Sequence, residues 1–131
     1  MQHEGATCDA SLHELVRQWI ALQKVDVGSE EHADLAWAAN QIAVLTWKEP
    51  DTAWEAILGI LARDHSERVM ENLAGGPLED LLVKHGPDVI ERVEAEAQRN
   101  PRFAGILGGV WKNAMDDAVW DRLQRAWTLN G

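Results

Sequence analysis

Five histidines are the first side chains to weigh for metal chemistry: His3, His13, His32, His65 and His85. A zinc site on a helix needs two of them three or four residues apart, as in H-E-x-x-H, so that both rings lie on one face. No pair of histidines in this sequence has that spacing. His13, His32 and His65 each adjoin a carboxylate instead, and neighbouring side chains on a helix point about 100° apart. The sequence therefore predicts no metal ligands and no cofactor.

Paired carboxylates are candidates for general acid–base chemistry, and the sequence offers two pairs. Glu79 and Asp80 are adjacent, and Glu91 and Glu94 stand three residues apart. The first pair falls in the first turn of an expected helix, where acidic side chains interact favourably with the helix dipole. The second pair falls on the solvent side of another helix. We expect structural roles for both pairs, and an enzyme that uses Glu79 and His85 is kept as a minor alternative.

The nucleophilic side chains show no catalytic arrangement. Ser11 with Glu14, and Ser29, occupy positions typical of helix N-caps, and no serine stands in G-x-S-x-G. Cys8 is the only cysteine, so an internal disulfide is impossible and a reducing compartment is expected. These patterns predict no catalytic residue.

The charge of the chain restricts its partners. Twelve Lys and Arg side chains stand against 22 Asp and Glu side chains, a formal net charge of −10 over 131 residues. Such a surface repels phosphate groups, so nucleic acid and anionic membranes are disfavoured, and it attracts proteins with a basic surface. No window approaches the roughly 18 consecutive apolar residues of a membrane span. We expect a cytoplasmic protein.

Apolar residues recur at helical spacing along the chain, and no alternating pattern typical of a strand is present. Each of the four prolines precedes such a stretch, as expected for proline at the first helical position. Gly75-Gly76 and Gly86 stand directly before two of these prolines, where they predict helix ends. The four prolines are Pro50, Pro77, Pro87 and Pro101.

These signals predict an all-α, compact bundle of about eight short helices in antiparallel hairpins. We expect a single domain over residues 1–131, with a frayed N-terminal segment over residues 1–10. The glycines of Gly105-x-x-Gly108-Gly109 lie inside one expected helix and predict close approach of another helix. The expected helices cover about 12–24, 30–47, 50–61, 66–73, 77–85, 87–97, 101–110 and 116–127.

Tryptophan dominates the aromatic residues, since seven tryptophans accompany one phenylalanine and no tyrosine. Indole rings bury a large area, so most are expected in the core, with one or two at an interface. The stretch 33–47 is apolar on nearly every side, which is typical of a helix at the centre of a fold.

A partial internal echo relates Trp47-Lys48 and Trp54 to Trp111-Lys112 and Trp120. Two interpretations stay open. The echo is either a coincidence or the trace of a repeated helical hairpin, as in a HEAT-like short solenoid.

Several short motifs follow one another in order between Pro50 and Trp120. They include G-P-L-E-D-L-L, H-G, I-E-R-V-E-A-E-A, N-P-R-F and V-W. In this order the chain resembles a family of small uncharacterised bacterial proteins that form a domain of unknown function. The resemblance implies an α-helical, HEAT-like fold and brings no activity, cofactor or catalytic residue. The residues that carry it are Gly76, Pro77, Glu79, His85, Gly86, Pro101, Trp111 and Trp120.

These observations favour a non-catalytic protein-binding module, most concretely an acidic immunity or antitoxin-like protein that neutralises a toxin by direct binding. Acidic faces would steer a basic partner, and an exposed tryptophan would anchor it. The alternative is a regulatory adaptor or a self-associating helical protein, with a homodimer as its simplest form. The predicted binding residues are Glu30, Glu31, Asp34, Glu91 and Glu94.

Overall fold

The computed structural model describes residues 4–130, with side chains from Ser11 onward. Among these residues it contains helices and no strand, which confirms the all-α prediction. The chain divides into two compact units, Met1–Val69 and Met70–Gly131. A single domain over residues 1–131 stays a prediction beside this division. The side chain of Cys8 lies outside the described residues.

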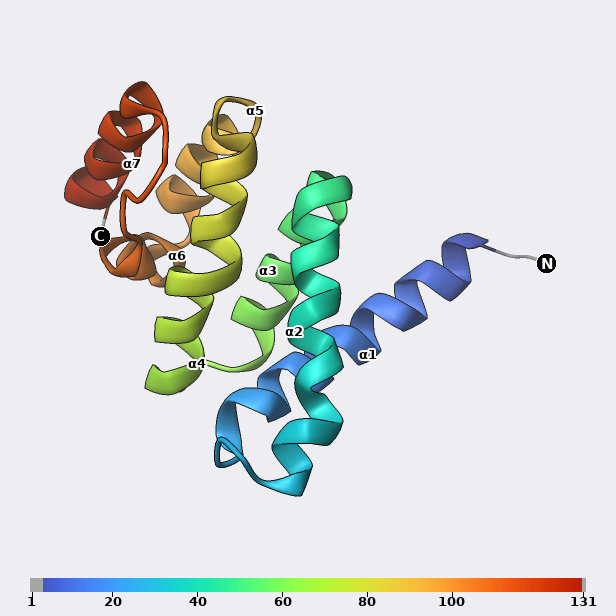
Figure 1. The fold of residues 1–131 in the computed structure, drawn as a ribbon. Helices are drawn as coiled ribbons and strands as arrows, with labels where there is room; N and C mark the ends of the chain where they lie inside the picture. Colours follow the sequence, from blue (N-terminus) through green and yellow to red (C-terminus); the bar gives the residue numbers. More distant parts are fainter. Residues whose placement is uncertain (1–3, 131) are drawn as a thin grey trace. The chain divides into compact units, whose positions relative to one another are not determined.

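The first unit is built from α1 (Glu4–Lys24), α2 (Glu30–Lys48) and α3 (Pro50–Arg63), each of which packs against the other two. The N-terminal turns of α1 extend past the ends of α2 and α3 (Figure 1). The start predicted near Leu12 was wrong, because α1 already begins at Glu4 and Ser11 lies inside it. No proline stands between these two residues, so nothing there stops the helix. Of the frayed segment predicted over 1–10, residues 1–3 lie outside the described residues.

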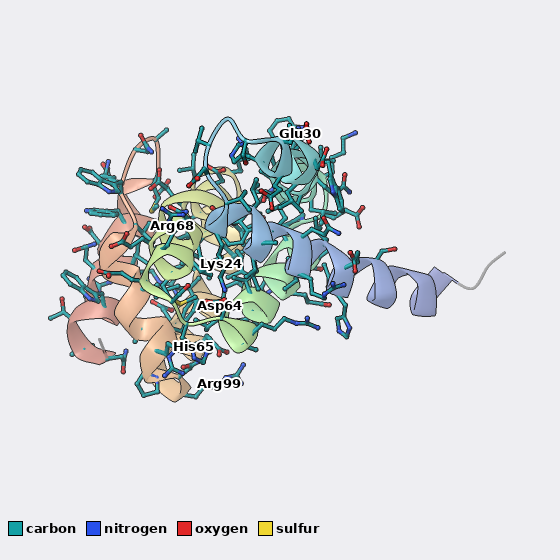
Figure 2. All side chains as sticks on the ribbon, turned by 90° about the horizontal axis from the view of Figure 1, so that it is seen from below. Lys24, Glu30, Asp64, His65, Arg68 and Arg99 are labelled. Carbon is teal, nitrogen blue, oxygen red and sulfur yellow. The ribbon has the colours of Figure 1, made fainter. Side chains whose placement is uncertain are left out.

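The ends of α1 and α3 are joined by an ion pair between Lys24 and Asp64 (Figure 2). The hydrogen bond from Lys24, with a second from the Ser66 backbone N–H at 2.9 Å, holds the pKa of Asp64 well below its ordinary value. Arg68 adds a hydrogen bond of 2.9 Å to the carbonyl oxygen of Gln23. At the start of α2, Ser29 Oγ accepts a hydrogen bond of 3.0 Å from the His32 backbone N–H, so its predicted capping role is confirmed.

The second unit contains the π-helix η1 (Ala74–Leu78), α5 (Glu79–Arg99), α6 (Pro101–Ile106), the 3₁₀-helix η2 (Leu107–Gly109) and α7 (Asp117–Asn130). Helix α4 (Glu67–Leu73) runs across the boundary between the units. Within the second unit α5 packs against η1, α6 and α7. The largest fully buried side chains of this unit include Leu78, Leu81, Leu82, Ile90, Phe103, Leu107 and Leu123.

The helix end predicted at Gly75-Gly76 was wrong, because α4 continues through η1 into α5. Pro77 lies inside this continuous stretch. A proline in a regular α-helix lacks an N–H and pushes against the carbonyl four residues before it. The wider π turn has room for the proline ring. Just after the turn, the Glu79 backbone N–H donates a hydrogen bond to the Gly76 carbonyl oxygen.

The helices expected over 77–85 and 87–97 form one element, α5, which is kinked at His85 (φ −135°, ψ 26°). Pro87 disfavours regular helical geometry just before it, which explains the kink. The predicted break before Pro87 is confirmed, since His85 leaves helical geometry and divides α5 into two helical segments. Gly86 also has a packing role. A Cβ atom there would lie 3.0 Å from both methyl groups of Val119, so glycine permits the close approach of α5 and α7.

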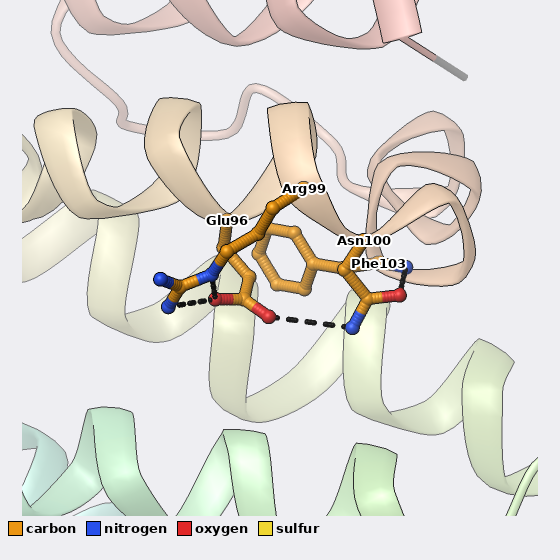
Figure 3. Close-up of polar contacts among 4 residues, drawn as sticks. All are labelled: Glu96, Arg99, Asn100 and Phe103. Atoms are coloured by element: carbon orange, nitrogen blue, oxygen red, sulfur yellow. Dashed lines mark hydrogen bonds and ion pairs between the residues drawn. The ribbon is translucent and has the colours of Figure 1, made fainter.

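Asn100 begins α6 as predicted, with Pro101 in its first turn. Asn100 Oδ1 accepts hydrogen bonds from the backbone N–H groups of Arg102 (3.1 Å) and Phe103 (3.3 Å). Its Nδ2 donates to the buried carboxylate of Glu96, which also accepts from Arg99 Nη2 at 2.6 Å (Figure 3). One side chain therefore fixes both the end of α5 and the start of α6.

Three glycines of α6 and η2 were predicted to permit the close approach of another helix, and two of them do so. A Cβ atom on Gly108 would lie 2.7 Å from Cε2 of Trp127, and one on Gly109 would lie 3.2 Å from Cβ of Ala74. A Cβ atom on Gly105 would meet nothing within 4 Å.

Gly108→Ala is therefore expected to lower the free energy of unfolding by about 1 to 3 kcal/mol. The new methyl group would overlap the indole of Trp127, which must then leave its place against η2. Gly105→Ala is the matched control and should raise stability by up to about 1 kcal/mol, since alanine favours a helix. Urea unfolding of both variants measures the difference. Equal stabilities for the two variants would contradict the contact.

Candidate functional site

The carboxylate of Glu79 is buried and holds a loop of the second unit in place. Its Oε1 accepts a hydrogen bond of 3.0 Å from the Trp111 backbone N–H, and its Oε2 accepts one from Asn113 Nδ2. Asn113 has a left-handed backbone (φ 47°), which asparagine tolerates better than most residues. Val110 and Met115 of the same loop are buried. Glu79 thus fixes the loop that carries Trp111.

The enzyme alternative assigned acid–base chemistry to Glu79 and His85, and the contacts of Glu79 give it a structural role instead. Both carboxylate oxygens of Glu79 already accept hydrogen bonds from the loop, so the group positions backbone. His85 is half-buried at the kink of α5. The other residues of the family pattern take structural positions: Gly76 and Pro77 in η1, Gly86 in α5, Pro101 at the start of α6, and Trp120, half-buried, in α7.

Three of the predicted binding residues lie together. Glu30, Glu31 and Asp34 are exposed in the first two turns of α2. Such acidic side chains also interact favourably with the N-terminal end of the helix dipole. They make this end of α2 a negatively charged surface.

Glu91 and Glu94 belong to α5, in the other unit. Glu91 is exposed, whereas Glu94 binds Arg122 of α7 through two hydrogen bonds of 2.9 and 2.5 Å. The hydrogen bond from Arg122 lowers the pKa of Glu94 below its ordinary value, and burial opposes this in part. Glu94 is thus engaged within the unit and joins two of its helices.

The expectation that most tryptophans lie in the core was wrong. All seven lie within the described side chains, and only Trp19 and Trp54 are buried. Trp120 is half-buried. The exposed fractions of the remaining four are 75% for Trp111, 63% for Trp47, 45% for Trp37 and 39% for Trp127.

Helix α2 has two apolar faces, and one of them is exposed. Ala38, Ile42 and Leu45 are buried, in a helix that packs against α1 and α3. Val44 and Trp47 lie on the other side of the helix, and Trp37 lies at the border between the two sides; all three are exposed. The apolar pattern of 33–47 predicted a helix at the centre of the fold, whereas one side of α2 is exposed. The signal of the exposed face was the position of two large indoles outside the aliphatic stripe.

A groove lies between α1, α2 and the first turn of α3, with a volume of about 460 Å³. Leu12, Leu15 and Leu45 give it an apolar lining, and Trp37 lines it from α2. Two carboxylates, Glu14 and Glu49, also line it. We call this site the Trp37 groove. The Trp37 groove was not predicted from the sequence, because its lining residues come from three helices and no local pattern encodes how these helices pack.

Residues 11–130 contain no group of three or more His, Cys, Asp or Glu side chains that could hold a metal ion. No helix within the described part of the chain is both long enough and apolar enough to span a bilayer.

Residues 25–131 match DUF6869, which is described as a family of unknown function. The match begins earlier than the region from Pro50 over which the motifs indicated a resemblance. No curated protein and no solved structure matches the chain.

Removal of the Glu79 carboxylate is expected to destabilise the second unit. Glu79→Ala leaves two hydrogen-bond donors of the loop without their acceptor, which costs about 1 to 3 kcal/mol in urea unfolding. Glu79→Gln should cost less, because the Asn113 amide can turn to meet the new one. Amide exchange at Trp111 should quicken in Glu79→Ala.

Asp80→Asn is the matched control for this experiment. Asp80 is exposed, and partial desolvation raises its pKa while Lys84 opposes this, so its neutral replacement should not lower stability. A loss in Asp80→Asn as large as in Glu79→Ala would show that charge in this turn matters more than the loop contacts.

The ion pair between Glu94 and Arg122 predicts a specific pH dependence. Because the folded-state pKa of Glu94 is depressed, the pair contributes stability above the ordinary carboxyl value of 4.5, and this contribution is lost as the pH falls through the folded-state pKa. Arg122→Leu should therefore be less stable than the parent near neutral pH and approach it in acid. Urea midpoints measured from pH 7 to pH 3 test this. A stability difference that is constant with pH would contradict it.

Proposed function

The chain belongs to the family of unknown function DUF6869, and we propose that it is a non-catalytic protein-binding module that neutralises a toxin by covering it, in the manner of an immunity protein or antitoxin. The observation that carries the proposal is the exposure of four of the seven tryptophans. Tryptophan is the residue most enriched among those that dominate binding energies at protein interfaces.

The outward face of α2 is the best surface for this role. Trp37, Val44 and Trp47 expose large apolar areas along one helix. Contiguous exposed apolar surface on a small protein is typical of an interaction site. A helix face presents such anchors with little loss of backbone freedom on binding, because the helix is already formed.

The charge of the chain gives the partner its chemistry. A net charge of −10 attracts a basic protein and raises its rate of association. Glu30, Glu31 and Asp34 concentrate part of that charge at the beginning of the same helix. Many toxins that act on nucleic acid need a basic active surface, which an acidic protein can cover. A cytoplasmic location and HEAT-like stacking of the hairpins are parts of this proposal.

Self-association is the second candidate, and the same surface favours it. Between Asp34 and Lys48, α2 has no charged side chain of the kind that usually keeps helices apart in solution. A second copy of the chain that paired α2 with α2 would bury both sets of indoles. A regulatory adaptor without toxin-neutralising activity would use the same face.

The proposal predicts protection from a toxin encoded beside this protein in its genome. Co-expression should restore growth, and the purified pair should associate more slowly when NaCl is raised from about 50 to about 500 mM. Trp47→Ala should weaken the complex by about 2 kcal/mol or more, as expected for a hot-spot residue. Val27→Ala, at an exposed loop position, is the matched control and should change affinity little.

Failure of every neighbouring gene product to bind, together with a molecular mass twice that of the chain in light scattering, would replace this proposal by self-association. If neither Trp47→Ala nor NaCl changes the affinity or the association rate, then neither the α2 surface nor the net charge contributes to binding.

A further inference from the structure

We propose that the Trp37 groove binds an arginine side chain of a basic partner protein. The inference rests on the proposed function, because it names the chemistry by which such a partner would be recognised. It adds a site that is separate from Val44 and Trp47, which do not line the groove.

The inner part of the groove suits an aliphatic stem. Leu15 and Leu45 are buried and Leu12 is half-buried, and all three line the groove. A volume of about 460 Å³ lies within the range of pockets that hold small ligands. The methylene groups of arginine pack well against such a surface while the charged end stays near water.

Trp37 supplies the contact for the charged end. Its indole is 45% exposed and lines the groove from α2. A guanidinium group within about 6 Å of an indole ring is attracted by the negative face of the ring. Arginine stacks on tryptophan more effectively than lysine does, because its guanidinium is planar and weakly hydrated.

Two carboxylates line the groove, and Glu49 supplies the negative charge for a bound cation, because Glu14 is paired with Arg17. Glu49 is exposed at the junction of α2 and α3, and its side chain makes no capping hydrogen bond to α3. Glu14, on α1, accepts hydrogen bonds from Arg17 and from Gln18 Nε2 (2.6 Å), so its carboxylate already meets one guanidinium along the surface of α1. The Trp37 groove has no lysine or arginine in its lining.

A neighbouring groove of the same unit shows the contrast. It lies between α1 and α3 and is lined by three cations, Arg17, Lys24 and Arg63, and by one carboxylate, Asp64, which is paired with Lys24. A cation would be repelled there by like charges. Of these two grooves, the charge therefore directs a basic side chain to the one beside Trp37.

The test uses the full chain and a blocked pentapeptide, acetyl-Gly-Gly-Arg-Gly-Gly-amide. Nuclear magnetic resonance follows the seven indole N–H signals, with the Trp37 signal assigned from its loss in Trp37→Phe. We expect a saturable shift of the Trp37 signal with millimolar affinity, as a single side chain allows. The same peptide with citrulline, the neutral isostere of arginine, should bind at least about tenfold more weakly.

Glu49→Gln should weaken peptide binding by about threefold or more, since it removes one charged partner at an exposed position. Glu71→Gln removes the same charge at an exposed position of α4 that does not line the groove, and it is the matched control. Circular dichroism confirms that each variant is folded. The inference is overturned by equal binding of the citrulline peptide, by the absence of a Trp37 shift, or by equal effects of the two substitutions.

The failure of this inference differs from the failure of the proposed function. A toxin complex that ignores both Trp37→Phe and Glu49→Gln refutes the groove and leaves toxin binding in place. A groove that binds the arginine peptide in a protein that protects against no toxin refutes the proposed function alone. A dimer of this chain that dissociates on Glu49→Gln would assign the groove to a second copy and overturn the inference.

Discussion

A helix in a small unit of packed helices can bury only one of its sides, and this limit determines where the indoles of α2 lie. The buried side is aliphatic, with Ala38, Ile42 and Leu45. The units of this chain are small, so the surface is large relative to the volume it encloses. The large ring of Trp47 therefore remains on the opposite side and that of Trp37 at the border, both in contact with water. The exposed apolar face of α2 is a direct consequence of that geometry.

The second unit depends on buried carboxylates that tie irregular backbone to helices. Glu79 binds the loop after η2, and Glu96 binds Arg99 and Asn100 at the turn between α5 and α6. A buried carboxylate needs such donors, because its charge is costly without them. Glu96 lies next to the turn that it binds, whereas Glu79 lies in α5 and binds a loop more than 30 residues later, so each carboxylate sets the geometry of irregular backbone. The exposed Trp111 is positioned in this way.

Local patterns in the sequence were sufficient for the fold class and for several helix starts. Ser29 and Asn100 cap α2 and α6 as predicted, since capping depends on a few adjacent residues. Helix ends were less predictable. Gly86-Pro87 does mark a break, because His85 leaves helical geometry there. Gly75-Gly76 resembles a stop, yet the chain continues as a π turn, because packing of the flanking apolar residues outweighs the local cost of glycine and proline.

Only part of the candidate site could be predicted from the sequence, because the rest depends on tertiary packing. Acidic residues at the beginning of α2 can be identified from charge alone, and Glu30, Glu31 and Asp34 are exposed as a charged helix start requires. Glu94 resembles them in sequence but binds Arg122, which stands 28 residues later. The Trp37 groove likewise joins residues of three helices. Contacts of this kind depend on tertiary packing and have no local signature.

Under the proposed function, the arrangement of charge and indoles along α2 would separate the two stages of binding. From Glu30 to Trp47 a helix rises by about 25 Å, well beyond the distance of about 8 Å over which salt screens exposed charges at physiological ionic strength. The acidic first turns therefore act on a partner before contact, while the indoles act only once the surfaces meet. Substitutions at the beginning of α2 should change mainly the rate of association, and those at its exposed indoles mainly the rate of dissociation. A protein that must neutralise its target quickly and then retain it needs both properties, and this helix carries the residues for each.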